Sequence, residues 1–448
     1  MPAPTFARSW HRLCAATGVG IALAAAPAAA QPPPPQAVSI VDRQWLTERT
    51  LGLTVATDAF ADPVPVEVTF PAGYRADGAQ RWPVTYYLAG TGHDQTTFRA
   101  TYDGEANTAS YPSIVVAPRG DAGFWSDWLD NDADRSPKYE SFVIEQLIPL
   151  VDANFRTVPD RAHRAIMGES MGGFGTMLLS ARHPDRFVAA ASLSGVPDTN
   201  LPITWNVLSQ APLIQGGRPD AIYGPRATEE IRWRGHNPAD LAGNLRGVDL
   251  QLYTGNGVYD PAHGETPVEA SIGCALEREL VHPPSSSMHA VLSAHGIAHH
   301  WVDMPWGCHG VALFEAQIRQ ATRRFEQVFA DPPAVPERFD FRSIEPAFEV
   351  WGWSVRADPR RAVEFLDLAA ADSGGLTITG SGRTTITTPP LPRGSGAPTV
   401  TVDGTPADVS ADSDGRLTFV VELGPPAWQQ QFGPGAAGAT RTATVRIG

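Results

Sequence analysis

The feature that most restricts the fold of this chain is a serine between glycines, placed between an apolar strand and a helix. Residues 164–167 are short and apolar, as in a buried strand, and residues 174–181 follow a helical pattern. Between them the chain reads Gly-Glu-Ser-Met-Gly at residues 168–172, and Gly173 follows. A serine on so sharp a turn projects above the sheet edge, and the glycines let the backbone pass itself closely. The pattern predicts an α/β-hydrolase fold with a mostly parallel central sheet and Ser170 as its nucleophile.

The composition limits the kind of partner. The chain has 48 acidic and 34 basic residues and a formal net charge of −14. Because a chain with this negative charge is repelled by nucleic acid and by anionic membrane surfaces, we expect neither as its main partner. Its 448 residues suffice for one large α/β domain and a smaller one.

The N-terminus has the pattern of a secretory signal peptide over residues 1–30. Arg8 and Arg12 precede an apolar run over residues 13–26, and three alanines come directly before Gln31. A membrane anchor is the alternative, but the run is short and rich in alanine and glycine, and no later stretch is apolar enough to span a bilayer. We therefore expect a cleaved chain that is secreted or associated with the cell envelope.

Export leaves two cysteines, Cys274 and Cys308. An even pair in an oxidising compartment predicts a disulfide, with two buried free thiols as the alternative.

The chain divides into segments of different character. A proline-rich linker covers residues 31–37, and residues 38–330 alternate apolar strands with helices, as in a catalytic α/β domain. Within this domain, the irregular stretch 200–244 suggests a cap over the site. A second linker is expected at 331–339. Residues 340–448 form short alternating runs between glycine and proline turns, which predicts a small β-sandwich of unknown role.

An activated serine needs a base, and in α/β-hydrolases that base is a histidine after the last strand. The last strand is expected near residues 299–304, and His309 lies in the loop that follows it. His295, His299 and His300 lie in a turn or within the strand. His309 is therefore the predicted base.

The acid that orients the histidine should follow the strand ending at residues 255–257. Glu277 is favoured, because a Cys274–Cys308 bond would hold its helix beside the loop of His309. Glu269 is the main alternative. The full set of candidate carboxylates is Asp260, Glu265, Glu269, Glu277 and Glu279.

Two backbone N–H groups should form the oxyanion hole. One belongs to Met171, directly after the nucleophile, and the other to Thr91 in the glycine loop at residues 89–92. A plain tight turn is the alternative for that loop. The aromatic run at residues 124–128 should rim the pocket, with Trp125 and Asp127 as candidate substrate contacts or as packing residues.

Residues 40–330 resemble the esterase family that includes the antigen 85 type mycolyltransferases and the S-formylglutathione hydrolases. The matching stretches are residues 86–90, 115–118, 124–128, 168–173, 183–187, 255–257 and the loop of His309. The resemblance favours the mycolyltransferase branch, which uses a glutamate as its acid. It implies acyl transfer from an ester, through an acyl-enzyme, to an alcohol or water, without a metal or organic cofactor.

Some positions depart from the trehalose-binding members of that family, which carry an aspartate and an arginine around the oxyanion turn. Here Ala89 and Gly92 stand in their places, and Val311 replaces an aromatic residue after the histidine. The sequence therefore leaves open whether water or an alcohol accepts the acyl group. Two other functions also stay open: a non-catalytic envelope- or matrix-binding protein, and a polyester depolymerase with an adhesive C-terminal domain.

Overall fold

The computed structural model describes residues 38–129, 136–391, 399–432 and 436–448. The predicted signal peptide (1–30) and proline-rich linker (31–37) lie outside the described residues. The described residues form one compact unit. Within the described ranges, no helix is long and apolar enough to cross a membrane.

A nine-stranded sheet with the order β1-β2-β3-β5-β4-β6-β7-β8-β9 dominates the first part of the unit. In this spatial order, the neighbours β1, β2, β3 and β5 pair antiparallel. The remaining pairs, from β5–β4 to β8–β9, are parallel. The mostly parallel central sheet is thus confirmed. The strands are β1 (Ser39–Trp45), β2 (Thr50–Ala56), β3 (Val64–Thr69), β4 (Val84–Leu88), β5 (Ile114–Pro118), β6 (Arg164–Glu169), β7 (Ala189–Leu193), β8 (Asp249–Thr254) and β9 (His300–Asp303).

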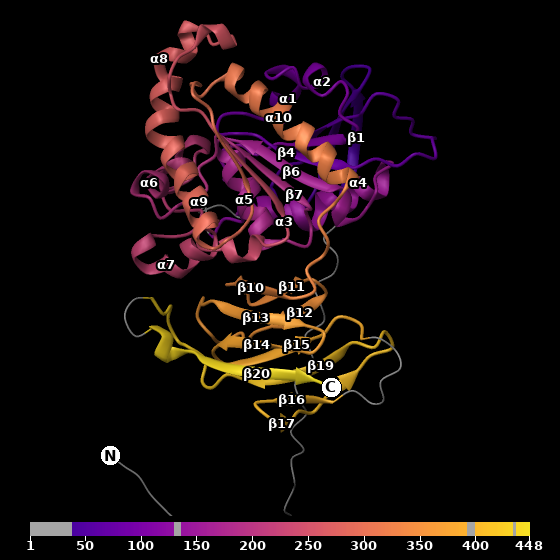
Figure 1. Cartoon of the computed structure of the whole chain (residues 1–448), viewed down its shortest axis with the longest axis vertical. Coiled ribbons are helices and arrows are strands. Elements are labelled where there is room, and N and C mark those ends of the chain that lie inside the picture. The colour runs from indigo at the N-terminus through magenta and orange to yellow at the C-terminus, as the bar shows by residue number, and fades with distance from the viewer. Residues whose placement is uncertain (1–37, 130–135, 392–398, 433–435) are drawn as a thin grey trace, which may run out of the picture. The chain divides into compact units, whose positions relative to one another are not determined.

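The central strands are buried on both faces, which explains their unbroken apolar runs. On β4, Tyr86 belongs to one hydrophobic cluster and Tyr87 to another, because successive side chains point to opposite faces. Helix α5 (Met171–Arg182) packs in the first cluster. Helix α10 (Val311–Ala330) packs in the second and crosses the sheet in Figure 1.

Residues 200–244 correct a prediction, because they are largely helical rather than irregular. They form α6 (Pro202–Gln210), a 3₁₀ turn at Ala211–Gln215, α7 (Arg226–Gly235) and a 3₁₀ turn at Ala242–Leu245. Pro202 and Pro212 stand in the first turn of α6 and of the 3₁₀ segment that follows it. A missing N–H costs nothing there.

Eleven short strands of the described C-terminal region form two antiparallel sheets around their own hydrophobic cluster. One has the order β10-β13-β14-β20-β16-β17 and the other β11-β12-β15-β19-β18. This is the predicted small all-β sandwich. The strands are β10 (Phe339–Ser343), β11 (Ala347–Val350), β12 (Trp353–Arg356), β13 (Leu366–Asp372), β14 (Gly375–Gly380), β15 (Arg383–Thr387), β16 (Val400–Val402), β17 (Thr405–Pro406), β18 (Ser410–Ala411), β19 (Leu417–Glu422) and β20 (Arg441–Ile447).

Candidate active site

Ser170 stands on a strained turn between the end of β6 and the start of α5. Its backbone has φ 55° and ψ −117°, a positive-φ conformation that few non-glycine residues adopt. The neighbouring glycines make the turn possible. A Cβ on Gly172 would lie 1.8 Å from the Leu88 carbonyl oxygen, and one on Gly168 would lie 2.5 Å from it.

The turn opens into a cavity of about 400 Å³. Ser170, His309, Thr91 and Met171 all line it, so the structure brings together the predicted nucleophile, base and oxyanion donors. One part of the lining is mainly apolar, formed by Phe124, Met171, Val196, Val207, Leu276, Leu280 and Val281.

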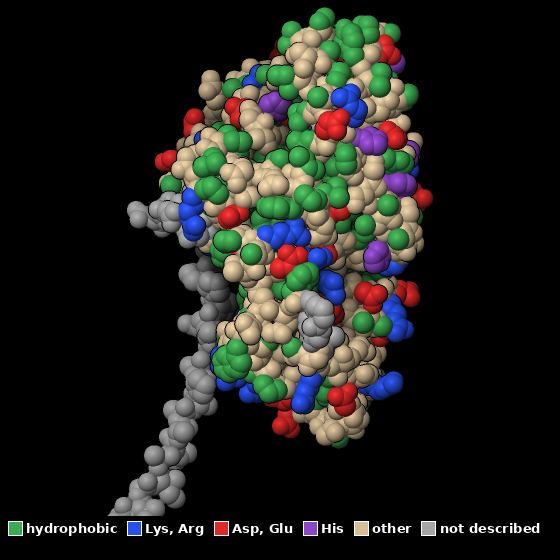
Figure 2. Space-filling view, turned by 90° about the vertical axis from the view of Figure 1, so that its left-hand side faces the viewer, with side chains coloured by type: hydrophobic (Ala, Val, Ile, Leu, Met, Phe, Trp, Pro, Cys, Tyr) green, Lys and Arg blue, Asp and Glu red, His purple; other side chains and the backbone are tan. Residues whose placement is uncertain are grey.

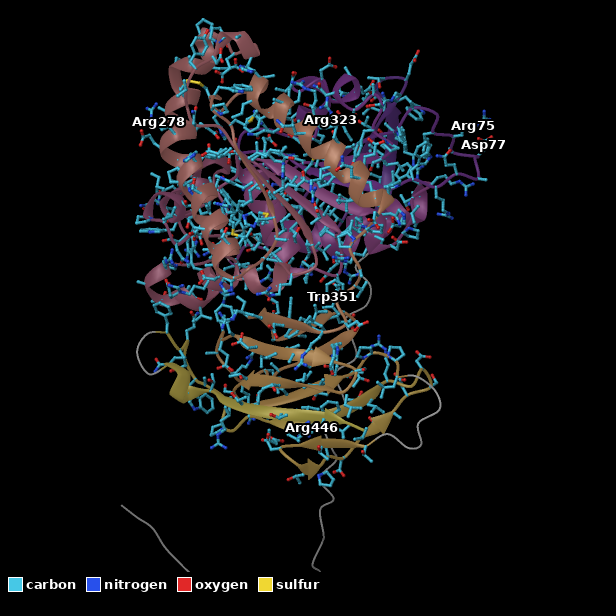
Figure 3. All side chains as sticks on the ribbon, in the orientation of Figure 1. Arg75, Asp77, Arg278, Arg323, Trp351 and Arg446 are labelled. Carbon is cyan, nitrogen blue, oxygen red and sulfur yellow. A yellow bond between two sulfur atoms is a disulfide. The ribbon has the colours of Figure 1, made fainter. Side chains whose placement is uncertain are left out.

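His309 is held by Glu277. The His309 Nδ1 lies 2.7 Å from Glu277 Oε2. Glu277 is fully buried, and its other oxygen accepts hydrogen bonds from Ser194 Oγ (2.7 Å) and the Gly255 N–H (2.7 Å). These hydrogen bonds offset the free-energy cost of burying a carboxylate, and they fix its orientation towards the imidazole. The adjacent Arg278 points outward from the same helical segment (Figure 3).

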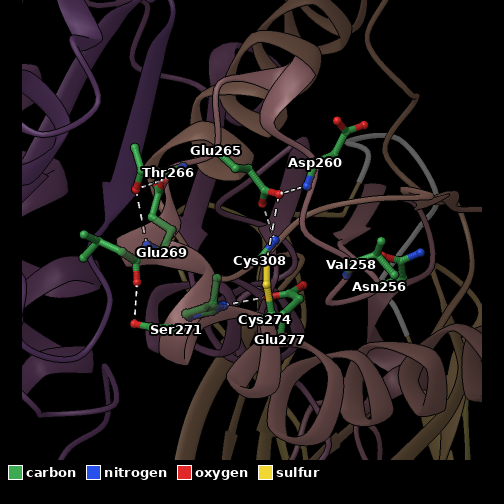
Figure 4. Close-up of a disulfide and its surroundings, with 12 residues drawn as sticks. Asn256, Val258, Asp260, Glu265, Thr266, Glu269, Ser271, Cys274, Glu277 and Cys308 are labelled. Atoms are coloured by element: carbon green, nitrogen blue, oxygen red, sulfur yellow. Dashed lines mark hydrogen bonds and ion pairs between the residues drawn. A yellow bond between two sulfur atoms is a disulfide. The ribbon is translucent and has the colours of Figure 1, made fainter.

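Asp260, Glu265 and Glu269 accept hydrogen bonds from the surrounding backbone (Figure 4), and Glu279 pairs with the Arg278 side chain at the surface. Glu269 forms a capping box with Thr266 at the start of α8 (Pro267–Leu276), and it accepts a hydrogen bond from the Val311 N–H (2.7 Å). Glu265 accepts hydrogen bonds from the N–H groups of Cys308 and Asp260. Glu277 is thus the carboxylate in contact with His309.

The structure contains the Cys274–Cys308 disulfide (Figure 4). Cys274 belongs to α8, which leads directly into the turn of Glu277, and Cys308 directly precedes His309. The bond therefore links the two segments that carry the imidazole and its carboxylate, as the sequence predicted.

Trp125 and Asp127 do not reach this cavity. The Trp125 side chain is fully buried, and its Nε1–H donates to the Ala89 carbonyl (3.2 Å). Asp127 accepts hydrogen bonds from the N–H (3.0 Å) and hydroxyl of Ser141, and burial raises the pKa of Asp127 to about 6. Of the aromatic run at residues 124–128, Phe124 lines the cavity, whereas Trp125 has the buried position of the packing alternative.

Sequence reasoning missed a second imidazole–carboxylate pair in the same cavity. Glu169, the variable second position of the serine motif, is fully buried, and its Oε1 lies 2.8 Å from His93 Nδ1. Both residues line the cavity. An acidic residue at the end of a strand with an apolar, buried centre was the available signal, because such a carboxylate needs partners.

The fold is that of an α/β-hydrolase, and Ser170 and His309 line one cavity in it. The chain belongs to the esterase family, whose model matches residues 57–325. Among the residues that the structure describes, no group of three or more His, Cys, Asp or Glu side chains is placed to hold a metal ion.

The chain is similar in sequence to curated esterases and acyltransferases. An esterase of Mycobacterium tuberculosis is 32% identical over 275 residues, which cover 60% of this chain and 57% of the relative. The diacylglycerol acyltransferase/mycolyltransferase Ag85B of Mycobacterium leprae is 29% identical over 196 residues, covering 40% of this chain and 57% of that protein. The chain thus spans little more than half the length of these curated relatives.

Solved structures share the fold. MPT51 of Mycobacterium tuberculosis superposes with a TM-score of 0.50 at 22% identity, covering 62% of this chain and 97% of that one. An S-formylglutathione hydrolase from Agrobacterium tumefaciens gives 0.51 at 15% identity, covering 64% and 98%. The predicted α/β-hydrolase fold and the resemblance to this esterase family are confirmed.

Proposed function

We propose that the chain is a serine enzyme that hydrolyses carboxylic esters or transfers their acyl group to an alcohol. The observation that carries the proposal is the arrangement of Ser170 and His309 in one cavity, with Glu277 Oε2 at 2.7 Å from the imidazole. Membership of the esterase family supports the reaction class.

In the proposed mechanism, His309 Nε2 accepts the Ser170 hydroxyl proton while Oγ attacks the ester carbonyl carbon. The N–H groups of Thr91 and Met171 donate to the oxyanion, and Glu277 stabilises the imidazolium. Met171 is the first residue of α5, so its N–H has no partner within the helix. His309 then protonates the leaving alcohol, and the acyl group stays on Ser170.

The second half of the reaction releases the acyl group. A water or alcohol oxygen attacks the acyl-enzyme while His309 accepts its proton, and collapse of the tetrahedral intermediate returns that proton to Ser170 Oγ. These steps need no cofactor.

The cavity favours an ester with an apolar acyl chain, of the fatty or mycolic type. Its apolar lining includes Leu276, Leu280 and Val281. The same region carries exposed apolar residues, since Val268 and Ile272 on α8 are 81% and 74% exposed. Figure 2 shows hydrophobic side chains gathered at the end of the molecule formed by α8. Such a surface suits a water-insoluble ester.

Location and domain division remain part of the proposal. The N-terminal sequence pattern supports export and cleavage after residue 30, which would place the mature chain outside the cell or at its envelope. The separate hydrophobic clusters support the predicted division into a catalytic domain over 38–330 and a sandwich domain, except that the sandwich begins at Phe339, the first residue of β10, and not at residue 340.

The test is turnover of a p-nitrophenyl ester series from acetate to palmitate by the full chain and by Ser170→Ala. We expect activity in the wild type, a preference for chains longer than acetate, and loss in the variant to background. Glycerol present as acceptor separates the two reaction types, because a transferase forms acylglycerol and a hydrolase forms only free acid. Wild type and variant equally inactive on the whole series would contradict the proposal.

A further inference from the structure

Glu169 is a buried carboxylate that the reaction steps above do not use. Its side chain is fully buried, and its two carboxylate oxygens have three hydrogen-bond partners within 2.8 Å. The Tyr87 hydroxyl lies 2.7 Å from Oε2, and the Gly90 N–H and His93 Nδ1 each lie 2.8 Å from Oε1. So complete a set of donors means that Glu169 is held in one orientation.

The contacts of Glu169 join the two segments that carry the predicted oxyanion donors. Glu169 directly precedes Ser170 and Met171 on the turn, and Gly90 directly precedes Thr91 on the loop after β4. The segments lie very close together, because a Cβ on Gly90 would be 3.2 Å from both Glu169 Oε1 and Ser170 Cβ. One carboxylate oxygen therefore binds the backbone of the loop to the nucleophile turn.

His93 fastens the other end of the same loop. Its backbone N–H donates to the Gly90 carbonyl (3.1 Å), which closes the turn around Thr91, and its side chain bonds the same Glu169 oxygen. The His93 side chain is 39% exposed on the cavity side, whereas Glu169 is not exposed at all. Of these two cavity-lining residues, His93 is therefore the one with an exposed side chain.

The surroundings of His93 favour its charged form. The hydrogen bond with Glu169 raises the pKa of His93, and the charge of Asp94 acts in the same direction. Tyr102 and Tyr87 face the pair as neutral hydroxyls, because burial raises their pKa values well above the usual range. The pair therefore has no net charge while His93 is protonated, and this state is lost as the pH rises through the raised pKa.

We propose that Glu169 and His93 are positioning residues that fix the distance between the N–H groups of Thr91 and Met171 in the oxyanion hole. The inference rests on the proposed function, since an oxyanion hole matters only if Ser170 attacks a carbonyl. Fixed donors stabilise the transition state more than the bound ester, and one such donor contributes about 10²–10³-fold to kcat. Loosening the loop should therefore lower kcat and leave KM nearly unchanged.

The main test compares Glu169→Gln with Glu67→Gln as a matched control. Glu67 on β3 is also a buried carboxylate, and Arg99 donates to it through Nε and Nη2 (2.8 Å each), but it does not line the cavity. We expect kcat to fall about 10–100-fold in Glu169→Gln, with KM within about twofold. We expect kcat in Glu67→Gln to match the wild type.

A reversible transition-state analogue gives a readout that a merely structural role would not move. An alkylboronic acid forms a tetrahedral adduct with a serine and places a boronate oxygen in the oxyanion hole. Its Ki should rise in Glu169→Gln by the same factor by which kcat/KM falls. In Glu67→Gln, Ki should stay unchanged, even if the melting temperature falls.

His93 supplies a second, independent measurement. NMR titration of the labelled His93 ring should show a pKa above that of a free imidazole in the wild type and a lower one in Glu169→Gln. The variant His93→Gln, which keeps a donor near Glu169, should lose about three- to tenfold in kcat, because the loop keeps one of its two bonds.

The outcomes separate this inference from the proposed function. If the wild type turns over esters but Glu169→Gln keeps its kcat and boronate Ki, the positioning role is wrong and the esterase proposal stands. If Glu169→Gln and Glu67→Gln lose activity only in step with their melting temperatures, the role is structural and the inference also fails. If the wild type neither turns over esters nor binds the boronate, both proposals fall together.

Discussion

The cavity holds two imidazole–carboxylate pairs that are alike in chemistry and different in surroundings. In each, a fully buried glutamate lies within 2.8 Å of a histidine Nδ1, namely Glu277 with His309 and Glu169 with His93. The His309 side chain is 9% exposed, however, whereas that of His93 is 39% exposed.

The difference lies in what each glutamate also holds. Glu277 binds Ser194 and Gly255 at the strand ends, so it fixes an imidazole in a nearly closed site. Glu169 binds the Gly90 N–H, so it fixes a loop. An imidazole–carboxylate pair therefore does not by itself identify a catalytic base. In the same cavity, the pair of His93 and Glu169 contacts the backbone of the loop beside the nucleophile.

The largest expected effect separates the two histidines. His309→Gln should lower kcat about 10⁴–10⁶-fold, because His309 is the proposed acceptor of the serine proton. The matched variant His93→Gln should lose about tenfold at most. Steady-state turnover of p-nitrophenyl butyrate measures both, and comparable losses would abolish the distinction between the pairs.

Next in size is the loss of the carboxylate behind the base. Glu277→Gln should lower kcat about 10²–10⁴-fold, because a neutral amide does not stabilise the imidazolium. The melting temperature should change little, since the amide oxygen can still accept from Ser194 and Gly255. The variant Glu269→Gln tests the alternative acid, and a larger loss there than in Glu277→Gln would overturn the assignment.

Removing the disulfide should change stability more than turnover. The double variant Cys274→Ser and Cys308→Ser opens a crosslink between residues 34 apart in sequence. The free energy of unfolding should fall by about 3–4 kcal/mol. We expect kcat to fall about tenfold at most, because hydrogen bonds to Glu265 and Glu269 still hold the loop of His309. Urea unfolding measures the first effect, and an unchanged midpoint would contradict it.

The smallest effect concerns Asp127, which lies outside the cavity. Its pKa is raised to about 6 by burial, so its protonated form stabilises the fold at low pH and this contribution is lost as the pH rises through 6. Asp127→Asn lacks this titration, so its stability relative to the wild type should rise by about 1–1.5 kcal/mol between pH 5 and pH 8. Urea unfolding at both values measures this, with turnover expected to match the wild type. A large loss of turnover in Asp127→Asn would instead support a role of Asp127 as a substrate contact.

The site residues that could be predicted from the sequence are those that local pattern and chain order define. Ser170 followed from the strand, turn and helix around it, and His309 from its place after the last strand. Glu277 followed from the two cysteines, which the structure joins.

The features that the sequence analysis did not predict depend on local geometry and on long-range contacts, which composition does not reveal. Phe124 and Trp125 both have positive φ, at 50° and 52°, and Phe124 lines the cavity while Trp125 is buried away from it. The pair of His93 and Glu169 joins residues 76 apart. Prolines at helix starts such as Pro202 gave residues 200–244 the composition of a loop.

The most direct test of the central proposal is intact-protein and peptide mass spectrometry after incubation with a fluorophosphonate. The reagent loses fluoride when an activated serine attacks phosphorus, so one phosphonyl group should be added per chain, on the peptide that carries Ser170. Ser170→Ala should stay unlabelled, and His309→Gln should label far more slowly. An unlabelled wild type, or label on a different serine, would contradict the proposed role of Ser170.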